Sequence, residues 1–203
     1  MDNSTFLTKF FAGAVEFGNR HFTVSGLLFR DDKKVFAKIE MLLLLLTVLS
    51  VSVLFQIENF SFWPGLALCL IFSQRVFEYL IVYSRNFILS RGRVFTDFPD
   101  KKSRGEWIVI MFLLNLLQVI LVFALWYRFL SLHIPSAFSQ TIGVLDGFYL
   151  SVITFFTLGF GDIVPTAPVT KLIVSFQSFL SFYTLLIVMN GLIAHHFVGK
   201  DGH

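Results

Sequence analysis

Residues 157–162 read Thr-Leu-Gly-Phe-Gly-Asp and come directly after the apolar stretch 148–156. Two glycines at spacing two allow alternate residues to adopt φ values that a side chain disfavours. Such φ values let successive backbone carbonyls point the same way, with the intervening side chains packed behind the backbone. Rings of carbonyl oxygens can replace the water shell of a cation. We therefore expect an ion-binding segment formed by Thr157, Leu158, Gly159, Phe160 and Gly161.

The composition of the chain is that of a membrane protein. Of its 203 residues, 56% are hydrophobic, only 14% are charged and 27 are phenylalanine. Soluble globular domains carry about 25% charged residues. This composition excludes a disordered chain, a nucleic-acid-binding module and an ordinary cytosolic enzyme. Because the sequence also shows no catalytic triad and no Gly-rich phosphate loop, we expect no enzyme activity, organic cofactor, nucleic-acid partner or small-molecule ligand.

Four apolar segments are each long enough to cross a bilayer, which takes about 20 residues of helix. We expect two of them within 35–84, a third at 106–128 and a fourth at 168–198. Trp126 and Tyr127, near the end of the third segment, are residue types typical of the membrane interface. The apolar stretch before residue 157 is too short to span, so we expect a re-entrant helix that protein or water covers.

The basic residues indicate the orientation, because Lys and Arg collect on the cytoplasmic side. Six lie before the long apolar run that begins at Met41, six lie in the linker 85–105 and one lies in the tail, whereas only Arg128 and Lys171 lie on the opposite side. We therefore place both termini in the cytoplasm of a multi-pass cell-membrane protein. Residues 4–18 predict either an interfacial helix or a helix docked on the protein. The predicted divisions are 1–34 (cytoplasmic segment), 35–84 (peripheral helix pair), 85–105 (basic linker), 106–198 (pore-like domain) and 199–203 (tail).

The segment 157–162 resembles the selectivity filter of the potassium channels, which usually reads Thr-Val-Gly-Tyr-Gly-Asp. The resemblance continues on both sides, because 106–128 is similar to the outer helix, 146–156 to the pore helix and 168–198 to the inner helix of that family. It implies an all-α membrane protein with four transmembrane helices, a re-entrant pore helix and a filter loop, assembled as a fourfold homotetramer. It further implies K⁺ ions in the filter of a prokaryotic-type channel with two extra N-terminal helices.

We expect three residues near the filter to support it. Asp162 follows the filter, and Tyr149 stands where many family members carry an aromatic donor to that carboxylate. A pore-helix Glu of some members corresponds here to Ile153. Asp146 lies near the start of the pore helix, where negative charge is favourable.

The inner helix is expected to supply the rest of the pore. A glycine hinge of many members corresponds to Ser181, and Gly191 offers a hinge position nearer the cytosol. Helical spacing places a set of residues on one face that should line the cavity, with the narrowest apolar constriction near the last of them. These residues are Ser178, Phe182, Leu185, Met189 and Ile193, with Asn190 beside them.

Two charged residues, Arg75 and Glu78, lie inside the second span. Intramembrane charges are costly and indicate either a functional role or mutual neutralisation. Antiparallel packing of the first two spans brings Glu40 near them, so the three residues form either a structural triad or a gating element.

Passive, potassium-selective conduction across the cell membrane is the function that we predict. Two alternatives fit the same sequence. One is a weakly selective cation channel with this architecture, and the other is a non-conducting regulatory channel subunit.

Overall fold

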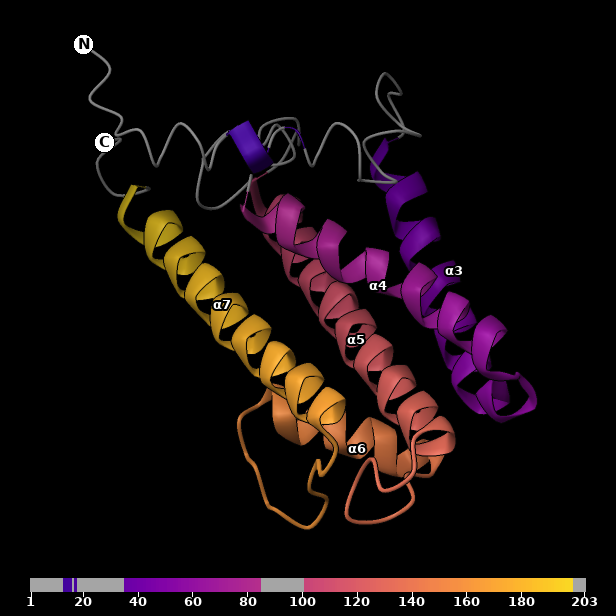
Figure 1. The fold of residues 1–203 in the computed structure, drawn as a ribbon. Helices are drawn as coiled ribbons and strands as arrows, with labels where there is room; N and C mark the ends of the chain where they lie inside the picture. Colours follow the sequence, from indigo (N-terminus) through magenta and orange to yellow (C-terminus); the bar gives the residue numbers. More distant parts are fainter. Residues whose placement is uncertain (1–12, 16, 18–34, 85–100, 199–203) are drawn as a thin grey trace. The chain divides into compact units, whose positions relative to one another are not determined.

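The computed structural model describes residues 13–15, 17, 35–84 and 101–198, with side chains at 13–15, 17, 41–82, 84 and 109–186. Among these residues, four helices are long and apolar enough to cross a membrane, and the predicted all-α fold with four spans and one short extra helix is confirmed. The elements, shown in Figure 1, are α3 (Val35–Gln56), η1 (Ile57–Asn59), α4 (Phe62–Tyr83), α5 (Lys101–His133), α6 (Val144–Phe155) and α7 (Pro168–Val198).

The chain forms two compact units. One contains Met1–Glu40, Phe77–Met111 and Leu185–His203, and the other contains Met41–Val76 and Phe112–Thr184. The second unit holds the hairpin between α3 and α4, all of α6, the segment 157–162 and most of the predicted site.

The helix α5 is the centre of the second unit. Its residues 118–125 are all buried, as in a helix that protein surrounds on every side. Gln118 Nε2 donates to Leu43 O of α3 at 2.6 Å, and Trp126 Nε1 donates to Ser73 Oγ of α4 at 2.8 Å. The α3–α4 hairpin therefore packs on α5 through polar contacts as well as apolar ones.

The short helix α6 packs against α5 and lies near the end at which α7 begins (Figure 1). Ser151 Oγ donates to Ile120 O at 2.8 Å. A Cβ added at Gly147 would lie 3.0 Å from Ala124 O, a backbone atom that cannot move aside. The absence of a side chain at Gly147 thus lets the two helices approach closely, with one turn of α6 antiparallel to one turn of α5.

The third span differs from its prediction at both ends. The helix Lys101–His133 is longer than the predicted 106–128. Both aromatic side chains contact other helices, because Trp126 is bonded to Ser73 and Tyr127 is completely buried. The helix continues beyond them to His133, and the interpretation of Trp126 and Tyr127 as interfacial residues stays a prediction.

The other predicted limits compare as follows with the structure. The helix α7 begins and ends at residues 168 and 198, as predicted, whereas α6 begins at Val144, two residues before the predicted start. The predicted helix at 4–18, most of the linker 85–105 and the tail 199–203 lie outside the described residues.

Candidate functional site

The backbone of residues 157–161 alternates in conformation. Thr157, Gly159 and Gly161 have φ values of 55°, 54° and 78°, whereas Leu158 and Phe160 are not in the left-handed region. The expectation of unusual φ at the two glycines is confirmed. Positive φ at Thr157 was not predicted, and it is strained because the residue is β-branched. Such strain persists only where the surrounding structure imposes it.

Every residue from 156 to 162 is exposed in the single chain. The side chains of Leu158 and Phe160 are 56% and 66% exposed. Since a Cβ at Gly159 or Gly161 would meet nothing within 4 Å, a side chain there would be disfavoured by the positive φ and not by lack of space. Irregular backbone at membrane depth is tolerated only where protein covers it or where it lines water. One chain alone supplies no such cover.

The start of α6 is fixed by Asp146. Its Oδ2 accepts a hydrogen bond from Gly143 N at 2.9 Å, directly before the first helical residue. The carboxylate thus satisfies an N–H at the helix start and lies at the positive end of the helix dipole.

The end of α6 leads directly into the alternating segment. Leu158 N donates to Ile153 O at 2.8 Å, and Thr157 N donates to Thr154 O at 3.2 Å. Ile153, which the resemblance aligns with a glutamate of some potassium channels, is buried and packs as an apolar side chain. Any displacement of this end of α6 would therefore move Thr157 and Leu158.

The bond predicted between Tyr149 and Asp162 stays a prediction. The Asp162 carboxylate acts on the Tyr149 hydroxyl, because interaction with this carboxylate, loss of solvation and the negative charge of Asp162 raise the pKa of Tyr149 above its ordinary value of 10.0. The middle of α6 therefore interacts with the residue directly after Gly161.

The segment beyond Asp162 is tied to the loop between α5 and α6. Ser139 N donates to Val164 O at 2.8 Å, and Val164 N donates to Ser139 Oγ at 3.0 Å. Thr170 Oγ1, in the first turn of α7, donates to Ala137 O at 2.8 Å. Residues 157–161 are thus held at both ends while their middle is open.

Two polar contacts join α6 to α7, one helical turn apart on each helix. Gln177 Nε2 donates to Ser151 O and Oγ at 2.8 and 2.9 Å, and Ser181 Oγ donates to Phe155 O. Gln177 also accepts a hydrogen bond from the Tyr127 hydroxyl. Ser181 therefore connects α7 with the end of α6, and α7 is a continuous helix through it. The hinge role of Ser181 stays a prediction.

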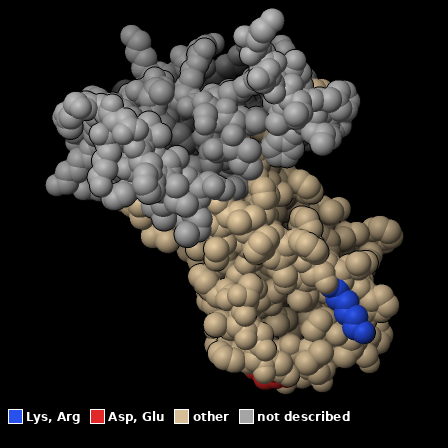
Figure 2. All heavy atoms as spheres, turned by 90° about the vertical axis from the view of Figure 1, so that its left-hand side faces the viewer, with Lys and Arg blue, Asp and Glu red and all other residues tan. Residues whose placement is uncertain are grey.

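The predicted cavity-lining residues that the structure describes are uncovered in the single chain. Phe182 and Leu185 are each 63% exposed, and Ser178 is partly exposed. Figure 2 shows the α7 side, where the described part carries few charged atoms. Met189, Asn190, Gly191 and Ile193 lie in the last part of α7, whose side chains are outside the described residues.

Arg75 belongs to a buried polar cluster that joins three helices. Its Nε donates to Gln118 Oε1 of α5 at 3.3 Å. Gln118 Nε2 donates in turn to Leu43 O at 2.6 Å and to Thr47 Oγ1 at 3.0 Å, both on α3. Gln118 was not predicted, although an amide in a membrane span signals a partner on another helix.

The predicted pairing of Arg75 with Glu78 or Glu40 stays a prediction. Glu78 is buried and has an interaction partner. The side chain of Glu40 lies outside the described residues.

A second unpredicted cluster surrounds Arg128, near the end of α5. One terminal nitrogen lies 2.6 Å from Glu58 Oε2, in the connection between α3 and α4, and the other donates to Ile142 O, just before α6. Ile142 N donates to Ser131 Oγ at 2.8 Å. Arg128 Nε is buried and has no hydrogen-bond partner among the described residues.

Comparison with known proteins shows that the part of the chain from α5 to α7 is similar to ion channels. Residues 110–195, from α5 to α7, match the family model described as "Ion channel". Two-pore potassium channel 4 of Arabidopsis thaliana is 30% identical over 92 residues, which are 45% of this chain and 28% of that relative. No solved structure matches the chain. The similarity agrees with the predicted membrane location and with the prediction that the chain is not an enzyme.

Proposed function

We propose that this chain is a subunit of a potassium-selective channel that conducts K⁺ passively across the cell membrane. The observation that carries the proposal is the alternation of left-handed φ at Thr157, Gly159 and Gly161. With this alternation, carbonyls from Thr157, Leu158, Gly159 and Phe160 can replace the water shell of K⁺. Similarity to a relative named a potassium channel favours K⁺ over other cations.

A ring of carbonyls requires more than one copy of the segment. Residues 156–162 are exposed in one chain, and so are Leu172, Phe179 and Phe182 of α7, at 70%, 75% and 63%. A closed fourfold homotetramer covers the segments with one another, and cyclic symmetry gives each copy the same environment. In this arrangement Phe182 and Leu185 line the cavity below the filter.

The decisive test is Gly159→Ala in protein reconstituted into liposomes. Alanine at a φ of 54° costs about 1–2 kcal/mol in each subunit, so the carbonyl row should break. We expect the ratio of K⁺ to Na⁺ flux to fall to about one. Gly13→Ala is the matched control, because Gly13 has the same open space without a positive φ.

Three outcomes separate the candidate functions. A K⁺-selective flux that survives Gly159→Ala contradicts the filter assignment. An unselective flux in the wild type favours a weakly selective cation channel, and no flux from purified oligomers favours a non-conducting regulatory subunit.

A further inference from the structure

Arg128 joins the α3–α4 hairpin to the start of α6, and we infer that the hairpin regulates conduction through this residue. The inference rests on the proposed function, because α6 leads into the segment 157–161. One end of the guanidinium binds Glu58 at 2.6 Å, and the other donates to Ile142 O. Ile142 directly precedes Gly143, the N-cap of α6.

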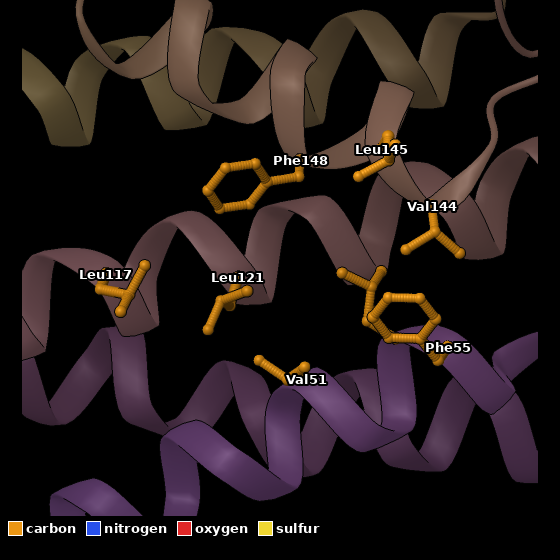
Figure 3. Close-up of a pocket in the computed structure, with 8 residues that line it drawn as sticks. Val51, Phe55, Leu117, Leu121, Val144, Leu145 and Phe148 are labelled. Carbon is orange, nitrogen blue, oxygen red and sulfur yellow. The ribbon is translucent and has the colours of Figure 1, made fainter.

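Beside this bridge, α3 and α6 are connected through α5, on which both helices pack. An apolar groove of about 280 Å³ separates α3 from α6, as Figure 3 shows. Glu58 lies three positions after Phe55, the last residue of α3 that lines the groove, and Ile142 lies two positions before Val144, the first residue of α6 that lines it. The groove is lined by Val51, Leu54 and Phe55 of α3, Leu117 and Leu121 of α5, and Val144, Leu145 and Phe148 of α6. Because the two helices leave space between them here, the polar bridge adds a connection near the end of this groove to the contacts that each helix makes with α5.

The hairpin is attached to α5 at a second level. Gln118 binds Thr47 Oγ1 at 3.0 Å and Arg75 at 3.3 Å. Thr47 lies eleven residues before Glu58, or about 16 Å along a helix. A rotation of the hairpin about the Gln118 contacts would therefore displace Glu58, and Arg128 would transmit that displacement to α6.

The electrostatics of Arg128 make the bridge sensitive to Glu58. The side chain of Arg128 is only 12% exposed, whereas that of Glu58 is 54% exposed. Both terminal nitrogens of Arg128 are engaged and its Nε has no partner in the described part of the chain. Without the Glu58 carboxylate, a nearly buried cation would keep only a carbonyl as partner, which favours its reorientation towards water. Ile142 would then lose its bond and the start of α6 would loosen.

Glu58→Gln tests this inference, because it removes the charge and keeps the shape of the side chain. We expect faster amide hydrogen exchange at 142–147 in the purified protein. In liposomes we expect the K⁺/Na⁺ flux ratio to fall about two- to fivefold, since partly exposed ion pairs are weak. In an Arg128→Leu background, Glu58→Gln should have no further effect on either measurement. Ser52→Ala is the control, because the Ser52 hydroxyl bonds only within α3 in the described structure.

Each remaining outcome contradicts the inference. Unchanged exchange at 142–147 in Glu58→Gln shows that the bridge does not hold α6. Faster exchange with an unchanged K⁺ flux and an unchanged K⁺/Na⁺ flux ratio shows that the hairpin does not regulate conduction. Independent effects of Glu58→Gln and Arg128→Leu show that the two residues do not act through each other. If the wild type carries no flux, the proposed function fails, and the exchange measurement still decides whether the bridge holds α6.

Discussion

At the scale of single residues, the interaction between Tyr149 and Asp162 makes the segment after α6 sensitive to alkaline pH. The folded protein raises the pKa of Tyr149 above 10.0, so the protonated hydroxyl is the form that the fold favours. This contribution is fully present below about pH 10 and is lost as the pH rises through the raised pKa, because the phenolate repels Asp162.

We predict a loss of K⁺ selectivity in the wild type when the external pH is raised above 10. Tyr149→Phe lacks the hydroxyl, so its selectivity should already be reduced at neutral pH. Its selectivity should not fall further at alkaline pH, because no Tyr149 hydroxyl remains to ionise. Flux ratios measured from pH 7 to about pH 11 check both statements. An alkaline step of the same size in Tyr149→Phe would show that another group causes it.

Thr157 shows where prediction from the sequence stops at this scale. A glycine permits positive φ because it lacks a Cβ, and both glycines of the segment have positive φ. A threonine ordinarily avoids positive φ, so the residue type alone does not predict the φ of 55° at Thr157. The conformation of Thr157 depends on the end of α6 and on the residues after Thr157, so it cannot be predicted from this one position.

At the scale of helices, the polar contacts between α5, α6 and α7 are the features that the sequence left undetermined. Apolar length predicted the spans, and the limits of α7 followed directly. Spacing along the chain does not tell which buried amide meets which hydroxyl, so the partners of Gln118, Gln177 and Arg128 emerged only in the structure. Their presence in apolar spans was a signal that each needed a partner.

Gln177→Leu should destabilise the packing of α7 on α6. The change leaves the Tyr127 hydroxyl without the acceptor Gln177 Oε1 and removes the bonds that Gln177 Nε2 donates to Ser151, all in a fully buried place. Each buried polar group left unpaired costs about 1–3 kcal/mol. Thermal unfolding in detergent should show a lower transition temperature for Gln177→Leu than for Tyr127→Phe.

The double variant refines that prediction. Because Tyr127→Phe removes one of the groups that Gln177→Leu would strand, the combined loss should be smaller than the sum of the single losses. A strictly additive loss, or an unchanged transition temperature in Gln177→Leu, would mean that these groups are satisfied in another way.

At the scale of the whole molecule, the two exposed faces of α7 should meet different surroundings in the assembly. Phe182 and Phe176 are 63% and 46% exposed in the single chain, and six positions place them about 120° apart around a helix. The proposed tetramer puts Phe182 in the water-filled cavity and Phe176 outside it.

Cysteine substitution checks this difference. Phe182→Cys should react with a charged, water-soluble thiol reagent during conduction, and the reaction should block K⁺ flux. Phe176→Cys and Leu180→Cys, the latter at a buried position, should not react. The natural Cys69 is completely buried, so its background should be low. Equal reactivity at 176 and 182 would contradict the proposed face.

The exposure of residues 156–162 in one chain also has a genetic consequence. In the proposed tetramer, every level of carbonyls would take one oxygen from each of four subunits, so one altered subunit would disturb the whole ring. A cell that makes both the natural chain and Gly159→Ala would therefore place at least one altered copy in most of its rings. Such an allele should be dominant, and the phenotype of a mixed population should resemble that of the altered chain alone.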